Sequence, residues 1–327
     1  MANQLSETET SRLGPARMEL LRARSKALQG LRSYFAKQDF VEIEPPHLVR
    51  APGMEPHLRP IRVGSDGWLI TSPEFHLKRL LAAGMPRIFS VCRCFRDDEA
   101  GIHHSKEFTM VEWYRAEPRL ESLMDDVEGL VSYLRVAMGL PSAPGKWKRI
   151  TVREAMRQFS HVDVIGDESA KQLAEKVKAS GVDVGQAEEW DDIFFCAFLD
   201  RVEPALKRLC EPVFVTEWPL PLSALARQIS NRPVVERFEL YANGLELANA
   251  FGELTCAREQ QRRFDADRKR LAELGQPPRP LDRKFLRALE EGMPESAGIA
   301  LGFDRLLMWL LGVENIADLQ AFADEEV

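Results

Sequence analysis

Two neighbouring stretches decide the fold of this chain: Arg93–Glu99 (RCFRDDE) and, after a short polar turn, His104–Tyr114 (HSKEFTMVEWY). Both runs favour β-strand and Gly101 between them favours a turn, so we predict an antiparallel hairpin. Alternate side chains of a strand share a face, which places Arg96 beside Asp98. One face of the second run carries Phe108, Met110, Glu112 and Tyr114. This mixture of charged and aromatic groups indicates a pocket wall; the alternative is a surface hairpin held by ion pairs.

A second hairpin is predicted around Asn243-Gly244, the strongest short turn signal between two strand-like runs. A two-residue turn pairs Tyr241 with Glu246 and leaves Glu239 and Glu246 as diagonal neighbours, on the order of 7–8 Å apart at the backbone. Two carboxylates at this separation can hold a hard cation such as Mg²⁺. A solvated acidic face is the other interpretation of the pair.

A helix start follows the strand-like run 68–71. Ser72 suits the N-cap, Pro73 suits the first helical position, and Glu74 complements the positive end of the helix dipole. These preferences give a sufficient structural account of Glu74, so its position alone does not establish a role in binding.

The composition excludes several classes of protein. The chain has 327 residues, of which 45% are hydrophobic and 29% charged, as in an ordinary globular protein. No apolar run approaches the ~20 residues needed to span a membrane, and residues 1–11 are expected to form a flexible tail without a secretory signal. Five cysteines without metal-site spacing indicate a cytoplasmic protein with reduced thiols. The net charge of −7 makes tRNA an unfavoured partner.

The first hairpin resembles motif 2 of the class II aminoacyl-tRNA synthetases, in the lysyl branch. Residues 12–37 with Phe40–Pro46 resemble motif 1, which implies a homodimer, and Met293–Arg305 resembles the glycine-bearing motif 3. The resemblance implies an α+β fold, in which an antiparallel β-sheet is flanked by helices. It also implies one catalytic domain over residues 12–327, with a helical insertion between motifs 2 and 3 at about 151–209.

The resemblance assigns an ATP site with Mg²⁺. Arg96 is expected to contact the α-phosphate and the substrate carboxylate, and Arg305 the γ-phosphate; these two are the predicted catalytic residues. Phe108 is expected to stack on adenine. The other residues expected at the nucleotide are Asp98 and His104 of the motif 2 loop and the magnesium ligands Glu239 and Glu246.

The resemblance also assigns an amino-acid site. Pro73–Leu80 (PEFHLKRL) matches a lysyl-type segment whose glutamate, here Glu74, takes the α-ammonium, and Asn249 is expected at the carboxylate end. The remaining predicted substrate-binding residues are Glu112, Tyr114, Glu253 and Ala300. Strict alternation cannot place Glu246, Asn249 and Glu253 on one face, so the resemblance implies a bulge or strand end after Glu246.

This inventory matches amino-acid activation. A carboxylate attacking the α-phosphate of ATP needs no protein base, but it needs in-line positioning and cancellation of phosphate charge. Two carboxylates and a phenol in the side-chain pocket suit a buried ammonium, so lysine or a close isomer is the expected substrate. The departures from the family pattern are Asp98 for glutamate, Ala250 for glycine and Cys256 for aspartate, and Ala250 makes the exact shape of the substrate pocket uncertain.

Because motif 1 lies close to the first residue of the sequence, we expect no anticodon-binding domain of the lysyl-tRNA synthetase type before it. The chain therefore resembles the elongation factor P–lysine ligases, which lack that domain and carry alanine where Ala300 stands. In that family the alanine accompanies a preference for (R)-β-lysine over lysine, and the acceptor is a lysine ε-amine on elongation factor P. The alternatives are a truncated lysyl-tRNA synthetase, an ammonia-using asparagine synthetase and an inactive binding module. The presence of Arg96, Arg305, Glu239 and Glu246 argues against the last.

Overall fold

The computed structural model describes residues 14–97, 101–142, 145–209 and 211–323. The predicted tail at residues 1–11 and the predicted ATP-site residue Asp98 lie outside these ranges.

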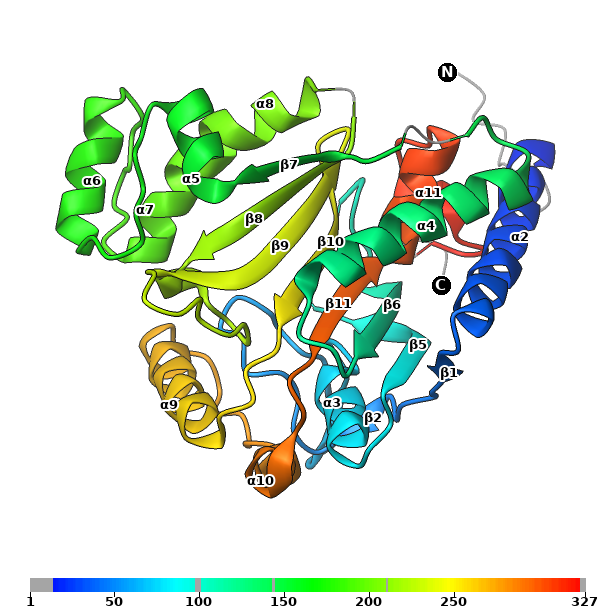
Figure 1. Cartoon of the computed structure of the whole chain (residues 1–327), viewed down its shortest axis with the longest axis horizontal. Helices are drawn as coiled ribbons and strands as arrows, with labels where there is room; N and C mark the ends of the chain where they lie inside the picture. The colour runs from blue at the N-terminus through cyan, green and yellow to red at the C-terminus, as the bar shows by residue number, and fades with distance from the viewer. Residues whose placement is uncertain (1–13, 98–100, 143–144, 210, 324–327) are drawn as a thin grey trace, which may run out of the picture.

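An eight-stranded sheet forms the centre of the described structure (Figure 1). Neighbouring strands are antiparallel, except at the two edges, where β1 pairs with β5 and β7 with β8 in parallel. In spatial order the strands are β1 (Val41–Glu42), β5 (Arg87–Phe95), β6 (Glu107–Arg115), β11 (Ala297–Gly302), β10 (Leu245–Gly252), β9 (Val234–Ala242), β8 (Val213–Pro219) and β7 (Lys148–Thr151). This architecture confirms the predicted α+β fold.

The two predicted hairpins are both present. β5 and β6 pair with Phe95 opposite Glu107, so β5 ends one residue before Arg96. Arg96 is nevertheless held at the strand end, since its N–H donates to the carbonyl of Lys106 at 2.9 Å. β9 and β10 pair with Tyr241 opposite Glu246, as the two-residue turn requires.

A small sheet of β2 (Leu48–Val49), β4 (Gly67–Leu69) and β3 (Arg62–Val63) leads into helix α3 (Glu74–Ala82). The expected helix start was wrong by one residue, because Pro73 occupies the cap position and Glu74 begins the helix. Ser72 still accepts a hydrogen bond from the Glu74 N–H at 3.0 Å. Its hydroxyl therefore satisfies one of the free donors that every helix N-terminus presents.

One face of the large sheet packs against α2 (Pro15–Lys37), α4 (Leu120–Met138) and α11 (Phe303–Leu311). Figure 1 shows α4 and α11 across this face and α2 at its β1 end. Phe35, Trp113 and Leu130 are fully buried in this core. A short 3-10 helix, η4 (Ile316–Leu319), follows α11.

A second apolar core holds α3 against α9 (Ala257–Glu273) and α10 (Arg283–Gly292). Phe75 of α3 stacks on Phe285 of α10 with ring centroids 4.7 Å apart, and Phe264 of α9 meets Phe75 edge-on. This core fixes α3, and with it the position of Glu74, beside the large sheet.

Residues 152–207 contain a series of helical segments, joined by loops, at the β7 end of the sheet (Figure 1). They are α5 (Val152–Ala155), the π-helical η1 (Met156–Ser160), α6 (Ala170–Ala179), α7 (Trp190–Ala197), the π-helical η2 (Phe198–Val202) and α8 (Glu203–Lys207). Phe194 and Phe198 pack with Trp218 of β8 in one apolar cluster, which joins these helices to the sheet. A 3-10 turn, η3 (Leu220–Leu222), ends β8.

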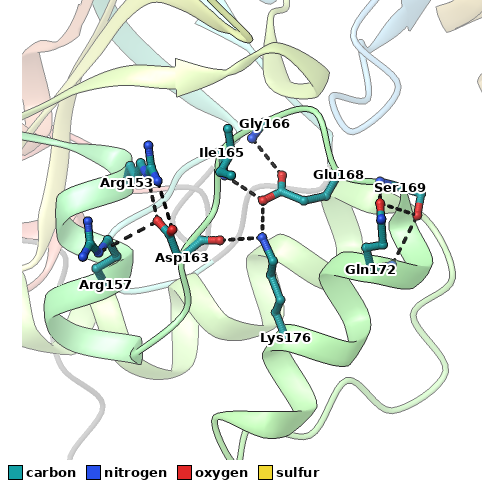
Figure 2. Close-up of polar contacts among 9 residues, drawn as sticks. All are labelled: Arg153, Arg157, Asp163, Ile165, Gly166, Glu168, Ser169, Gln172 and Lys176. Atoms are coloured by element: carbon teal, nitrogen blue, oxygen red, sulfur yellow. Dashed lines mark hydrogen bonds and ion pairs between the residues drawn. The ribbon is translucent and has the colours of Figure 1, made fainter.

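Polar contacts shape the loop between η1 and α6 (Figure 2). Glu168 accepts hydrogen bonds from the N–H groups of Ile165 and Gly166 and pairs with Lys176 at 2.6 Å. Arg153 makes a two-pronged pair with Asp163 at 2.6 and 2.9 Å. The Arg153–Asp163 pair is exposed, whereas Glu168 is largely buried beneath the loop backbone that it binds, so both pairs order the loop.

No helix in the described part of the chain is long and apolar enough to cross a membrane.

Candidate active site

A cavity of about 530 Å³ lies on the face of the sheet opposite α4 and α11. The structure brings every predicted site residue that it describes to the wall of this one cavity. They are Glu74, Arg96, His104, Phe108, Glu112, Tyr114, Glu239, Glu246, Asn249, Glu253, Ala300 and Arg305. Their positions agree with a common site, while their individual roles stay predictions.

Strand register explains why residues distant in sequence meet. β11 lies between β6 and β10, and Ala300 sits opposite Glu112 on one side and opposite Asn249 on the other. Cross-strand neighbours have Cβ atoms about 5 Å apart, so Ala300 separates the two polar groups at the floor of the cavity. Ala250 faces the opposite apolar core and does not line the cavity.

A bulge in β10 brings together the residues that alternation separates. The register shifts between Glu246 and Ala248, which leaves Leu247 without an opposite partner in β9. The extra residue rotates the strand, so Glu246, Asn249 and Glu253 all line the cavity. This confirms the bulge that the resemblance implied.

Lys78 is a buried cation that the sequence analysis did not assign. It is 1% exposed and lies between two cavity carboxylates, contacting Glu74 and pairing with Glu253 Oε2 at 2.5 Å. Burial acts to lower the pKa of Lys78, but the charges of Glu253 and Glu74 outweigh it and hold that pKa above its usual range. The i,i+4 spacing of Glu74 and Lys78 was the available sequence signal.

Glu112 is buried at the centre of the side-chain pocket. Its Oε1 accepts from the Ser72 hydroxyl at 2.6 Å, and its Oε2 accepts from the Tyr114 hydroxyl at 2.9 Å. Burial, followed by the charge of Glu74, raises the pKa of Glu112 well above its usual range. A bound cation would restore the ionised form, because opposite charge lowers a carboxyl pKa.

Two further acceptors face the same space without donors. Among the described residues, Glu253 Oε1 and Asn249 Oδ1 are buried and have no hydrogen-bond partner. Burial raises the pKa of Glu253 to about 7, against the opposing charge of Lys78. Buried acceptors of this kind are costly unless a ligand supplies the missing donors, so the cavity wall at Glu253 is suited to a substrate ammonium.

Gly298 is required by close packing rather than by unusual backbone geometry. A Cβ at this position would lie 2.2 Å from Tyr114 Cε1 and 2.3 Å from Glu253 Oε1. Small residues in a glycine-bearing strand such as motif 3 can let a nucleotide approach the backbone closely. At Gly298 the missing side chain instead makes room for Tyr114 and Glu253, two residues of the predicted amino-acid site.

The other end of the cavity carries the two predicted catalytic arginines. The Arg96 guanidinium lies over the Phe108 ring, 5.0 Å from its centroid. Arg305 donates to the carbonyl of Glu246 at 3.1 Å and to His104 Nε2 at 2.6 Å. Two guanidinium groups and an aromatic face fit a nucleotide with its phosphates.

Asp304, the neighbour of Arg305 in the chain, anchors the first turn of α11. It is 2% exposed, accepts from the Thr109 N–H of β6 at 2.7 Å and pairs with Arg24 of α2. This buried network fixes the first turn of α11 against the hairpin, so the adjacent arginine projects into the cavity.

Glu239 and Glu246 fit a divalent cation shared with a nucleotide. Burial, and then the charge of Glu246, raises the pKa of Glu239 to about 7, while the charge of Arg237 acts in the opposite direction. Glu239 meanwhile accepts from Arg237 at 2.5 Å and from the Tyr241 hydroxyl at 2.6 Å. No group of three or more metal-ligating side chains occurs in the described ranges, so phosphate oxygens and water would complete the shell of Mg²⁺.

The helical insertion contributes one wall of the cavity. The side chains involved are Phe195, Phe198, Leu199 and Glu203. Glu203 lies near Glu246 and Arg305, and burial together with the Glu246 charge raises its pKa. No local pattern in the sequence marks these residues.

The model of the family described as tRNA synthetases class II (D, K and N) matches residues 10–326.

Proposed function

The chain belongs to the class II tRNA synthetases of the D, K and N type, and from that premise we propose that it activates lysine or (R)-β-lysine with ATP and Mg²⁺ and transfers it to a lysine ε-amine on elongation factor P. Members of the family are ATP-dependent ligases that activate an amino acid. The choice of amino acid and the choice of acceptor are the parts that we propose.

The observation that supports lysine is the charge balance of the buried pocket. Glu74, Glu112 and Glu253 line it, and the buried Lys78 beside it is already paired with Glu74 and Glu253. An aspartate side chain would add a further negative charge beside Glu112, and an asparagine amide would leave the excess charge unbalanced. A substrate ammonium supplies both the charge and the donors.

The reaction then follows from positioning and charge cancellation. The substrate carboxylate attacks the α-phosphorus, forming a P–O bond while the bond to pyrophosphate breaks. Arg96 and Arg305 are placed to offset the phosphate charge, and Mg²⁺ held at Glu239 and Glu246 would supply further charge cancellation. In the second step an acceptor amine attacks the adenylate carbonyl, AMP leaves and the amine loses a proton.

Elongation factor P is proposed as acceptor because the chain resembles the protein ligases through the run that contains Ala300. The net charge of −7 supports a protein acceptor over tRNA, whose phosphates require compensating positive charge. A homodimer through the 40–46 segment is also proposed, by analogy with motif 1 of the family.

A competition experiment tests both proposals. Enzyme, ATP, Mg²⁺ and labelled lysine or (R)-β-lysine are supplied with bulk tRNA and elongation factor P together. Label on the protein supports the ligase, and label on tRNA identifies a lysyl-tRNA synthetase instead. Absence of amino-acid-dependent pyrophosphate exchange with either substrate contradicts the amino-acid assignment.

A further inference from the structure

Glu55 is a cavity residue to which no role has been assigned above. It lies on the loop between β2 and β3 and lines the main cavity together with Glu74. Glu55, Ser72 and Glu74 also line a small second cavity, so the two cavities share these three residues. Within the described part of the chain, Glu55 Oε2 is buried and has no hydrogen-bond partner.

A dedicated clamp holds the loop that carries Glu55. Arg279 is 4% exposed and donates to the carbonyls of Gly53, Glu55 and Leu58 at 3.2, 3.0 and 2.6 Å. Gln276 donates to the carbonyl of Pro56 at 3.0 Å and accepts from Arg279 at 2.7 Å. Because these bonds go to the backbone, the loop is fixed while the Glu55 carboxylate remains directed at the cavity.

Gly53 makes room for that carboxylate. A Cβ at Gly53 would lie 2.4 Å from Glu55 Oε2 and 2.9 Å from Thr71 Oγ1. The space beside the loop is therefore filled by the Glu55 carboxylate, because residue 53 has no side chain to occupy it.

The charged groups around Glu55 indicate which end of the proposed substrate it would contact. Burial, and then the charge of Glu74, raises the pKa of Glu55, while Arg96 and Arg279 act in the opposite direction. Arg96 and Glu74 are the residues expected at the carboxylate and the adjacent amino group of the amino acid. Glu112 and Tyr114, at the side-chain end, line the main cavity but not the small second cavity that Glu55 and Glu74 share.

We propose that Glu55 is a second specificity-determining carboxylate, which binds with Glu74 the amino group nearest the reacting carboxylate. This inference rests on the proposed function and deepens it. Two carboxylates on either side of one ammonium fix its distance from the carboxylate that reacts, so Glu55 contributes to the choice between an α- and a β-amino group.

The test compares ligands that differ in that amino group. Binding of lysine, (R)-β-lysine and ε-aminocaproate is measured by calorimetry on the full-length wild type, Glu55→Gln and the exposed control Glu188→Gln. ε-Aminocaproate keeps the carboxylate and the terminal ammonium but lacks the amino group in question. Glu55→Gln should weaken the preferred diamino acid on the order of tenfold to a hundredfold, as expected for a lost charged hydrogen bond.

The same substitution should leave the affinities for ε-aminocaproate and ATP within about twofold, since neither uses the contact. Equal weakening of all three amino-acid ligands, or no weakening of either diamino acid, would overturn the role of Glu55. Glu55→Asp replaces Glu55→Gln if the latter does not fold, with the same expected pattern of selective loss. A wild type that binds neither diamino acid would instead refute the proposed function itself.

Discussion

The ammonium of Lys78 lies 2.5 Å from Glu253 Oε2 and contacts Glu74 as well, so one buried cation holds two carboxylates of the cavity in place. Two of the three residues belong to α3, and Glu253 directly follows β10. This ion triad joins the helix to the sheet at the point where the substrate ammonium is expected.

Replacing Lys78 should therefore damage both stability and binding. Lys78→Met keeps most of the side-chain volume but leaves two buried carboxylates without their cation, which should cost about 3–5 kcal/mol. Denaturant unfolding measures the loss, with the exposed Lys284→Met as control. An unfolding free energy within about 1 kcal/mol of wild type would show that the triad is not important for stability.

Substitution of Glu112 should weaken the binding of the amino acid far more than the binding of the nucleotide. Glu112→Gln removes the charge facing the substrate ammonium, so the KM for lysine in pyrophosphate exchange should rise by on the order of a hundredfold. The KM for ATP should change little. The control is Glu107→Gln on the same strand, where the carboxylate is exposed. Equal losses for both substrates would remove Glu112 from the ammonium pocket.

Gly298 should not tolerate even one methyl group. Gly298→Ala forces Tyr114 and Glu253 apart, which should cost about 1–3 kcal/mol of stability and abolish most lysine activation. Gly302→Ala on the same strand is the stability control, because its nearest new contact would be 3.8 Å. Similar melting temperatures for the two variants would contradict the close packing at Gly298.

The stability of the ligand-free protein should fall as pH rises towards neutrality. The pKa of Glu239 is raised from its ordinary value of 4.5 to about 7, so between these values the folded state binds more protons than the unfolded state. Stability is thus lost with rising pH, by up to about 1.4 kcal/mol per pH unit for one such group.

Glu239→Gln isolates this contribution, since Glu253 and Asp267 have pKa values raised in the same direction. The variant should show a weaker pH dependence than the wild type in denaturant titrations on either side of neutrality, and Mg²⁺ with ATP should have the same effect on wild type by favouring the ionised pair. Identical pH slopes for the variant and the wild type would contradict the raised pKa of Glu239.

Ala300 should influence which isomer is accepted. Ala300→Gly removes the methyl group between Glu112 and Asn249, so the preference in pyrophosphate exchange should move from (R)-β-lysine towards lysine by roughly tenfold. Thermal unfolding checks that the fold is retained. An unchanged ratio of kcat/KM for the two isomers would place the discrimination elsewhere, for example at Glu55.

Local features of the sequence were sufficient for both hairpins. The turn at Asn243-Gly244 accepts only a few backbone geometries, so it fixed the pairing of Tyr241 with Glu246 before any tertiary contact was known. Alternation along β6 likewise placed Phe108, Glu112 and Tyr114 on one face. These outcomes depend on neighbours within a few residues, which is the range over which turn chemistry and strand periodicity act.

The helix start at Ser72 and the bulge at Leu247 show where local rules become insufficient. The helix began one residue later than its capping preferences suggested, and in the structure the Ser72 hydroxyl also donates to Glu112, forty positions away in the chain. The bulge follows no periodicity at all and was anticipated only from the family resemblance.

The sequence determined the two hairpins and, through the family resemblance, most of the residues predicted to form the site, which line one cavity. The tertiary structure decided that Lys78 neutralises two site carboxylates, that Glu55 joins them from a clamped loop, and that Glu203 of the insertion approaches Glu246. The physical reason is that burial and charge balance depend on distances between segments far apart in the chain. Those distances exist only after the sheet, its helices and the insertion have packed together.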